Sequence, residues 1–195
     1  MILYGEENTG KTSTLMYLAA LLAGSGRFVP TLWAKITSLF FSGRKTIKDA
    51  KFIVDYKGKL IFIATGGDSW AVCKDNYNFF SDVFKRLSMY IFDGTDVKRL
   101  EGKAKYAMKY HDPDICIGAC RPSGDRKGAI KSIHSYSEDI FLNNIHCYKD
   151  EKSILNYDLQ IWIKRNNKDY VLQALELLGA IDSYCSLGSS IILPI

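Results

Sequence analysis

Four residues near the start of the chain have the types and the spacing needed to hold a phosphate group. The pattern G-x-x-x-x-G-K-[ST] is filled by Gly5, Gly10, Lys11 and Thr12. Glycines let a backbone wrap tightly around an anion, so that successive N–H groups point inward toward it. A lysine in this place would reach the β- and γ-phosphates of a nucleotide, and a threonine hydroxyl would bind Mg²⁺. The spacing therefore predicts a phosphate-binding loop.

The segments on either side of this loop have the order that such a loop requires. Met1–Tyr4 is a short apolar run, which is typical of a strand. Ser13–Leu22 carries apolar residues at helical spacing, so a helix is expected to begin at the loop and to place its positive end beneath the anion. The residues expected to surround the phosphates are Gly5, Asn8, Thr9, Gly10, Lys11, Thr12 and Ser13.

With its strand, loop and helix, the start of the chain resembles the P-loop NTPase superfamily, whose Walker A motif is matched by Gly5–Thr12. The resemblance implies a three-layer α/β fold and binding of a nucleoside triphosphate with Mg²⁺. It covers the motif and its flanks only. It therefore points to a superfamily and leaves the reaction open.

A P-loop enzyme also needs an acidic residue at the carboxyl end of a central strand to organise the Mg²⁺. Two apolar runs, 52–54 and 60–64, are joined by a short linker with a glycine, which predicts an antiparallel hairpin. Asp68 follows the second run after two glycines, whereas Asp55 follows the first. The two aspartates would lie at opposite ends of the hairpin, so we expect Asp68 rather than Asp55 to bind the metal.

A basic loop follows the apolar run 115–120, which is expected to be a buried parallel strand. The loop 121–128 carries two arginines, Arg121 and Arg126, and two glycines. In composition and position this loop resembles the mobile loops of nucleotide kinases. In those enzymes, arginines on such loops close over the transferring phosphoryl group. Arg121 is therefore expected to contact phosphate and Arg126 is the second candidate, the alternative being that both are solvated.

The rest of the chain completes a single domain, 1–195, with a mostly parallel central sheet and one antiparallel strand from segment 52–55. Apolar residues at helical spacing predict helices over 31–41, 75–91, 97–110, 135–143 and 170–181. Short apolar runs predict further strands over 145–148 and 159–163.

Composition sets limits on the partners. The chain has 195 residues, 47% hydrophobic and 24% charged, with 26 basic against 21 acidic side chains and a net charge of +5. This excess suits a phosphorylated ligand and would tolerate nucleic acid without requiring it. Five cysteines without a CxxC pair, no secretory signal and no apolar run long enough for a bilayer predict a cytoplasmic protein that does not enter a membrane. The apolar segment 189–195 would dock on the core or on a second subunit of a homo-oligomer.

Two classes of function remain open at this point. The first is an enzyme that uses Lys11, Asp68 and Arg121 either to pass a phosphoryl group to a small-molecule acceptor or to hydrolyse the nucleotide. The second is a nucleotide-switched module that acts on a protein or a nucleic acid. ATP is expected rather than GTP, because the guanine-reading N-K-x-D pattern is absent from the sequence.

Overall fold

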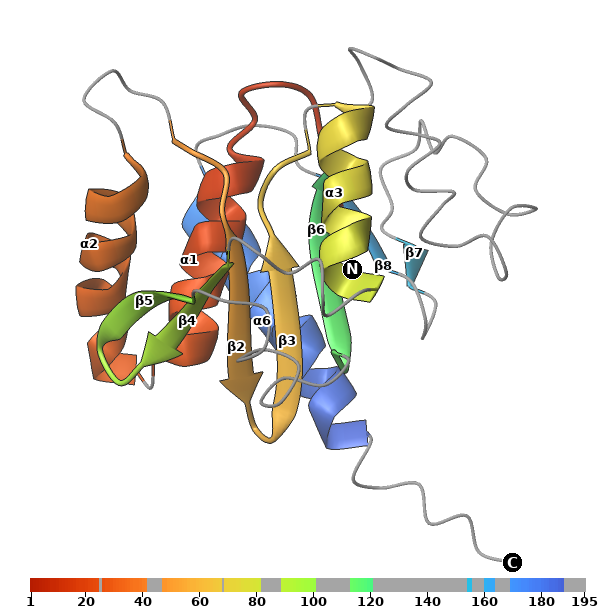
Figure 1. Cartoon of the computed structure of the whole chain (residues 1–195). Helices are drawn as coiled ribbons and strands as arrows, with labels where there is room; N and C mark the ends of the chain where they lie inside the picture. Colours follow the sequence, from red (N-terminus) through yellow and green to blue (C-terminus); the bar gives the residue numbers. More distant parts are fainter. Residues whose placement is uncertain are drawn as a thin grey trace, which may run out of the picture.

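The computed structural model describes residues 1–24, 26–41, 47–67, 69–81, 89–100, 113–120, 154–155, 160–163 and 169–187. The described strands are β1 (Ile2–Tyr4), β2 (Lys51–Tyr56), β3 (Lys59–Ala64), β4 (Met89–Asp93), β5 (Asp96–Leu100), β6 (Ile115–Cys120), β7 (Ile154–Leu155) and β8 (Gln160–Ile163). The described helices are α1 (Lys11–Ala23), the 3₁₀ turn η1 (Gly26–Phe28), α2 (Val29–Phe40), α3 (Trp70–Ser81) and α6 (Tyr170–Leu187). Together they form an α/β fold around one mixed sheet (Figure 1).

The described strands of the sheet stand in the order β5-β4-β2-β3-β6-β1-β8-β7. β1 lies between β6 and β8 and is parallel to both, and β3 is parallel to β6. β2 pairs antiparallel with β3, as the hairpin pattern predicts, and Asp55 pairs with Leu60 at the turn end. The expectation of a single antiparallel strand is wrong, because β4 runs parallel to β2 and β7 runs antiparallel to β8.

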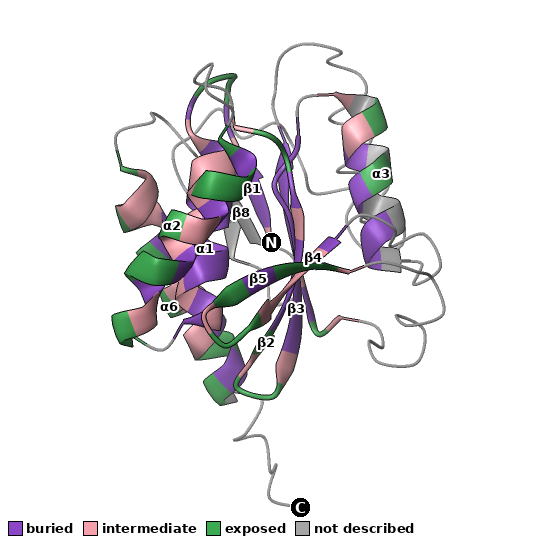
Figure 2. Cartoon of the chain, turned by 60° about the vertical axis from the view of Figure 1, so that its left-hand side comes forward, coloured by how far each residue is buried: buried purple, intermediate pink, exposed green. Residues whose placement is uncertain are grey.

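Helices cover both faces of this sheet (Figure 2). α1, α2 and α6 lie on one face, and α3 lies on the other. Side chains alternate along the central strands, so that Phe52 and Val54 of β2 join the core beneath α1, while Ile53 joins the core beneath α3. β3 alternates in the same way, with Ile61 on the first face and Phe62 stacked on Phe79 of α3, at 5.1 Å between ring centroids.

The helices expected near both ends of the chain are present as α1, α2 and α6. The prediction of a helix over 75–91 is wrong at its carboxyl end, because Met89–Asp93 forms β4. The prediction of a helix over 97–110 is wrong at its start, because residues 97–100 belong to β5. The turn between them explains the difference, because Gly94 has a φ of 59° and closes an antiparallel hairpin. Segments 101–112, 121–150 and 188–195 lie outside the described residues.

Among the described helices, none combines the length and the apolarity that a membrane-spanning segment needs.

Candidate functional site

The loop between β1 and α1 is tied to β6 and contains two residues with positive φ. Gly5 begins the loop and donates its N–H to the carbonyl of Cys120, at 3.1 Å, which ties the loop to the end of β6. Asn8 and Gly10 both have positive φ, 59° and 85°. Gly10 is the N-cap of α1 and receives no side-chain cap there, so the first amides of the helix stay available to a ligand. The loop therefore has left-handed backbone at Gly10 and leaves the start of α1 without a side-chain cap.

Lys11 folds back along this loop. Its ammonium donates to the carbonyls of Gly5 and Glu6, each at 2.7 Å, and only 6% of the residue is exposed. Thr9 closes the same loop by donating its hydroxyl to the Glu6 carbonyl at 2.8 Å. A buried ammonium favours a nearby anionic ligand, because a charge-assisted hydrogen bond to an anion offsets the hydration that burial removes.

Thr12, the last residue of the motif, faces a carboxylate that the sequence pattern did not single out. Its hydroxyl lies 3.2 Å from Oδ1 of Asp49 and 3.4 Å from the carbonyl of Thr65. The Thr65 hydroxyl also donates to Asp49 Oδ1, at 3.4 Å, and accepts the Ala50 N–H at 2.9 Å. The side chains of Thr12, Asp49 and Thr65 thus form one polar cluster beside the loop, which we call the carboxylate cluster.

The direction of β2 brings Asp49 to this place. Because β2 is antiparallel to β3, the residue just before β2 lies at the same edge of the sheet as the residue just after β3. That edge is the carboxyl edge of β1, where the loop begins, at the top of Figure 1. The signal was present in the sequence: the hairpin that places Asp55 at the far edge also places Asp49, six residues earlier, at the near edge.

Two glycines after β3 make room for this arrangement. A Cβ atom on Gly67 would lie 2.4 Å from the backbone carbon and oxygen of Ala119, at the end of β6. A Cβ on Gly66 would lie 2.9 Å from Oδ2 of Asp49. The Gly66 carbonyl accepts a hydrogen bond from the buried side-chain amide of Asn76 in α3, at 2.7 Å. The chain after β3 can therefore lie against β6 and beside Asp49 only without side chains.

The structure brings together most of the residues that the motif predicts. Gly5, Asn8, Thr9, Gly10, Lys11, Thr12 and Ser13 all lie in the loop or in the first turn of α1. Asp68, the predicted metal ligand, lies outside the described residues, and so do Arg121 and Arg126. Asp55 lies at the opposite edge of the sheet, as expected.

The carboxylate cluster offers too few protein ligands to hold a metal ion by itself, and Mg²⁺ is an ion that needs few. Among the residues that the structure describes, no group of three or more His, Cys, Asp or Glu side chains could hold a metal ion. Mg²⁺ usually keeps several waters and binds one or two protein oxygens together with substrate phosphates. The Thr12 hydroxyl and the Asp49 carboxylate lie close enough together, 3.2 Å apart, to offer two oxygen atoms to one such ion.

No protein-family model, curated protein or solved structure matches this chain.

Proposed function

We propose that the chain binds a nucleoside triphosphate with Mg²⁺ at Gly5–Ser13 and Asp49, and transfers or hydrolyses its γ-phosphoryl group. The observation that supports this most directly is the contact between Thr12 and Asp49, 3.2 Å from Oγ1 to Oδ1, at the base of a loop with positive φ at Asn8 and Gly10. A phosphate-binding loop with an acidic residue beside its threonine is the combination that Mg²⁺-dependent nucleotide chemistry requires.

Each group in the site has a separate role in this proposal. The loop amides would bind the phosphates, and Lys11 would neutralise the charge that develops on them as the reaction proceeds. Thr12 and Asp49 would hold Mg²⁺, which when bound supplies charge neutralisation at the β- and γ-phosphates. Asp68 and Arg121 remain proposed contributors to the metal site and to the transferring phosphoryl group.

The nucleotide is proposed to be ATP, because the N-K-x-D pattern that reads guanine is absent from the sequence. Competition between ATP and GTP for the same site tests this preference. Binding of GTP at least as tight as that of ATP would contradict it.

The experiment that tests the function is to incubate the purified protein with Mg-ATP and a pooled metabolite extract, and to measure ADP and free phosphate together. Lys11→Ala is the test variant. Lys35→Ala is the matched control, because Lys35 is paired with Asp96 at 3.0 Å and lies on α2, away from the loop. Lys11→Ala should weaken nucleotide binding by at least about tenfold, the cost of one charged hydrogen-bond donor.

The products distinguish the reactions. ADP in excess of phosphate would show transfer to an acceptor, and equal amounts would show hydrolysis. Bound nucleotide without either product would favour a switch that waits for a macromolecular partner. Binding and turnover that are the same in Lys11→Ala as in Lys35→Ala would refute the proposal.

A further inference from the structure

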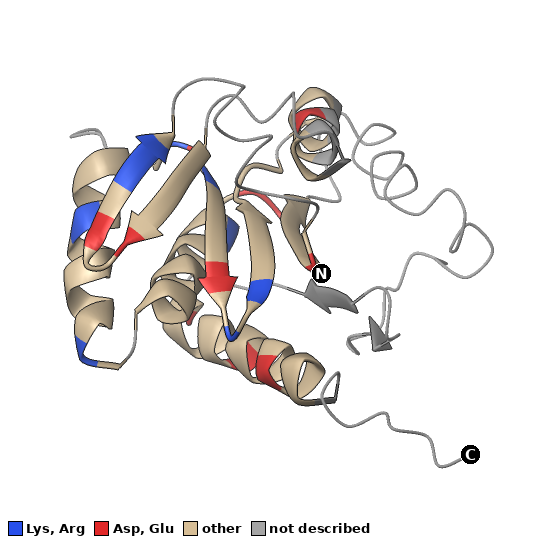
Figure 3. Cartoon of the chain, turned by 60° about the horizontal axis from the view of Figure 1, so that its bottom comes forward, with Lys and Arg blue, Asp and Glu red and all other residues tan. Residues whose placement is uncertain are grey.

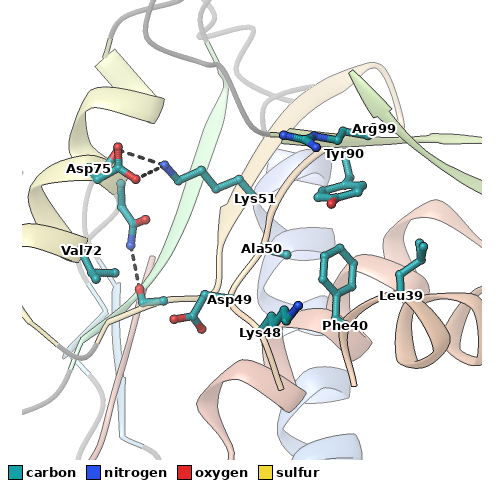
Figure 4. Close-up of a pocket in the computed structure, with 12 residues that line it drawn as sticks. Leu39, Phe40, Lys48, Asp49, Ala50, Lys51, Val72, Asp75, Tyr90 and Arg99 are labelled. Carbon is teal, nitrogen blue, oxygen red and sulfur yellow. Dashed lines mark hydrogen bonds and ion pairs between the residues drawn. The ribbon is translucent and has the colours of Figure 1, made fainter. Parts of the chain in front are cut away.

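A cavity opens beside the carboxylate cluster. It has a volume of about 460 Å³ and lies between the start of β2, helix α3, the end of α2 and the hairpin of β4 and β5 (Figure 4). Asp49 and Gly66 line it at the end nearest the loop, and Tyr90 and Arg99 line it on the hairpin side. Cavities of a few hundred Å³ are the usual size for small-molecule sites. We call this cavity the hairpin pocket.

The charges that line the hairpin pocket do not balance. Lys51 forms an ion pair with Asp75 across the α3 side of the pocket, so these two charges offset each other (Figure 4). Lys48 and Arg99 also line the pocket, both are exposed, and within the described part of the chain neither has an ion-pair partner. Asp49 faces Thr12. Among the described lining residues, three are basic (Lys48, Lys51 and Arg99) and two are acidic (Asp49 and Asp75), so the lining carries a net charge of +1.

Lys48 and Arg99 are each neighbours of an aromatic residue of the lining. Phe40 and Tyr90 pack edge to face at 4.8 Å between ring centroids and form one wall of the pocket (Figure 4). Arg99 is the cross-strand partner of Tyr90, and the Lys48 backbone N–H donates to the Phe40 carbonyl at 3.0 Å. An apolar wall with a few convergent charged groups is the usual construction of a site for a small organic ligand.

We propose that the hairpin pocket binds a small organic anion, a carboxylate or a phosphate monoester with a ring or another apolar body, beside the nucleotide. The anionic group faces Lys48 and Arg99, and the apolar body lies against Phe40 and Tyr90. A volume of about 460 Å³ suits a compact anion rather than the continuous phosphate backbone of a nucleic acid. If the proposed function holds, this anion is the second substrate of the reaction. Binding of the anion to the hairpin pocket does not depend on that function.

The test uses phenylphosphonate and benzoate as probes, titrated into the full chain by calorimetry. Arg99→Ala and Lys48→Ala should each weaken binding by about tenfold, since each removes one charged hydrogen-bond donor. Lys98→Ala is the matched control: Lys98 pairs with Asp93 and is next to Arg99 on β5, where successive side chains point to opposite faces of the sheet. The basic residues of β5 are coloured blue in Figure 3. The Lys98→Ala variant should bind the probes as the wild type does. Circular dichroism shows whether each variant keeps its fold.

A phosphonate could also enter the phosphate-binding loop, so the probes are titrated into Lys11→Ala as well. Probe binding that persists in Lys11→Ala and weakens in Arg99→Ala supports the proposal. Binding that is lost in Lys11→Ala and retained in Arg99→Ala would place the probe in the loop and overturn it. No binding of either probe up to millimolar concentration would overturn it too, as would equal effects of Arg99→Ala and Lys98→Ala.

Failure of this proposal is separable from failure of the proposed function. Nucleotide binding that depends on Lys11, together with no probe binding, would leave the nucleotide site intact and remove the hairpin pocket. Probe binding that depends on Arg99, without any nucleotide binding, would support the hairpin pocket and remove the nucleotide site.

Discussion

Replacement of Asp49 by asparagine tests the central geometric argument, that this carboxylate and Thr12 form the metal site. Asparagine has nearly the same volume and keeps an oxygen that can accept the hydrogen bond from Thr12, so the substitution removes the charge and little else. Asp49 is exposed, and an exposed substitution of this kind changes stability by only about 0.5 kcal/mol. An effect on catalysis would therefore come from the lost charge rather than from unfolding.

The size of the effect follows from the position of the carboxylate. The Asp49 oxygen lies 3.2 Å from the Thr12 hydroxyl, within the reach of a shared ligand, but at the surface, where solvent weakens electrostatic interactions. Two unit charges about 4 Å apart interact by about 1 kcal/mol in water and about 4 kcal/mol near a protein surface. A loss of about 1.5 to 3 kcal/mol corresponds to a roughly tenfold to hundredfold higher Mg²⁺ requirement.

The assay is ATP turnover at a fixed ATP concentration, titrated with Mg²⁺. Asp55→Asn is the matched control, because Asp55 belongs to the same strand and lies at the opposite edge of the sheet, paired with Leu60. Asp68→Asn is measured alongside, since Asp68 is the aspartate that the sequence favours. A Mg²⁺ requirement for Asp49→Asn equal to that of Asp55→Asn would refute the reasoning, and a larger shift in Asp68→Asn alone would move the metal site to the end of β3.

Three further predictions concern the frame that holds the site. Gly67→Ala places a Cβ 2.4 Å from the Ala119 backbone, so we expect a loss of about 1 to 3 kcal/mol in the free energy of unfolding, measured in urea, and weaker ATP binding. Tyr56→Phe removes the hydrogen bond that its hydroxyl donates to Asp182 at 2.6 Å, and should lower the free energy of unfolding by about 1 kcal/mol; an unchanged urea midpoint would contradict this. Lys57 and Tyr56, which both donate to Asp182, hold the pKa of that carboxyl below its ordinary value of 3.8. Its stabilising effect is therefore present above about pH 4 and is lost as the pH falls further, so that Asp182→Asn should destabilise the chain at pH 7 and much less at pH 3.

The order of strand, loop and helix around Gly5–Ser13 could be predicted from sequence because its determinants are local. Gly5, Gly10, Lys11 and Thr12 lie within eight consecutive residues, and the strand and helix around them follow from short-range patterns. Asn8 and Gly10, the two residues of the loop with positive φ, lie within the same eight residues. A motif of this kind can be recognised before anything is known about the sheet.

The β4 and β5 hairpin shows where local patterns are insufficient. Segment 89–100 has apolar and basic residues that fit a helix as well as a strand, and only pairing with β2 decides between them. Gly94, with its φ of 59°, was the local evidence for a hairpin. Because the strands were read as helices, Tyr90 and Arg99 could not be placed together, and the hairpin pocket could not be predicted.

Asp49 was missed for a different reason, which applies to other sites of this type. A search for a hydrophobic run closed by an aspartate assumes that the acidic residue follows a strand that is parallel to β1. Here the acidic residue precedes a strand that runs the opposite way, so the apolar residues of β2 come after Asp49 and the usual pattern is reversed. Predicted strand direction, rather than the order of residue types, identifies which end of a strand carries the acidic residue. In a mixed sheet, therefore, two kinds of acidic residue are candidate metal ligands. One kind follows a strand that is parallel to β1, and the other precedes a strand that is antiparallel to it.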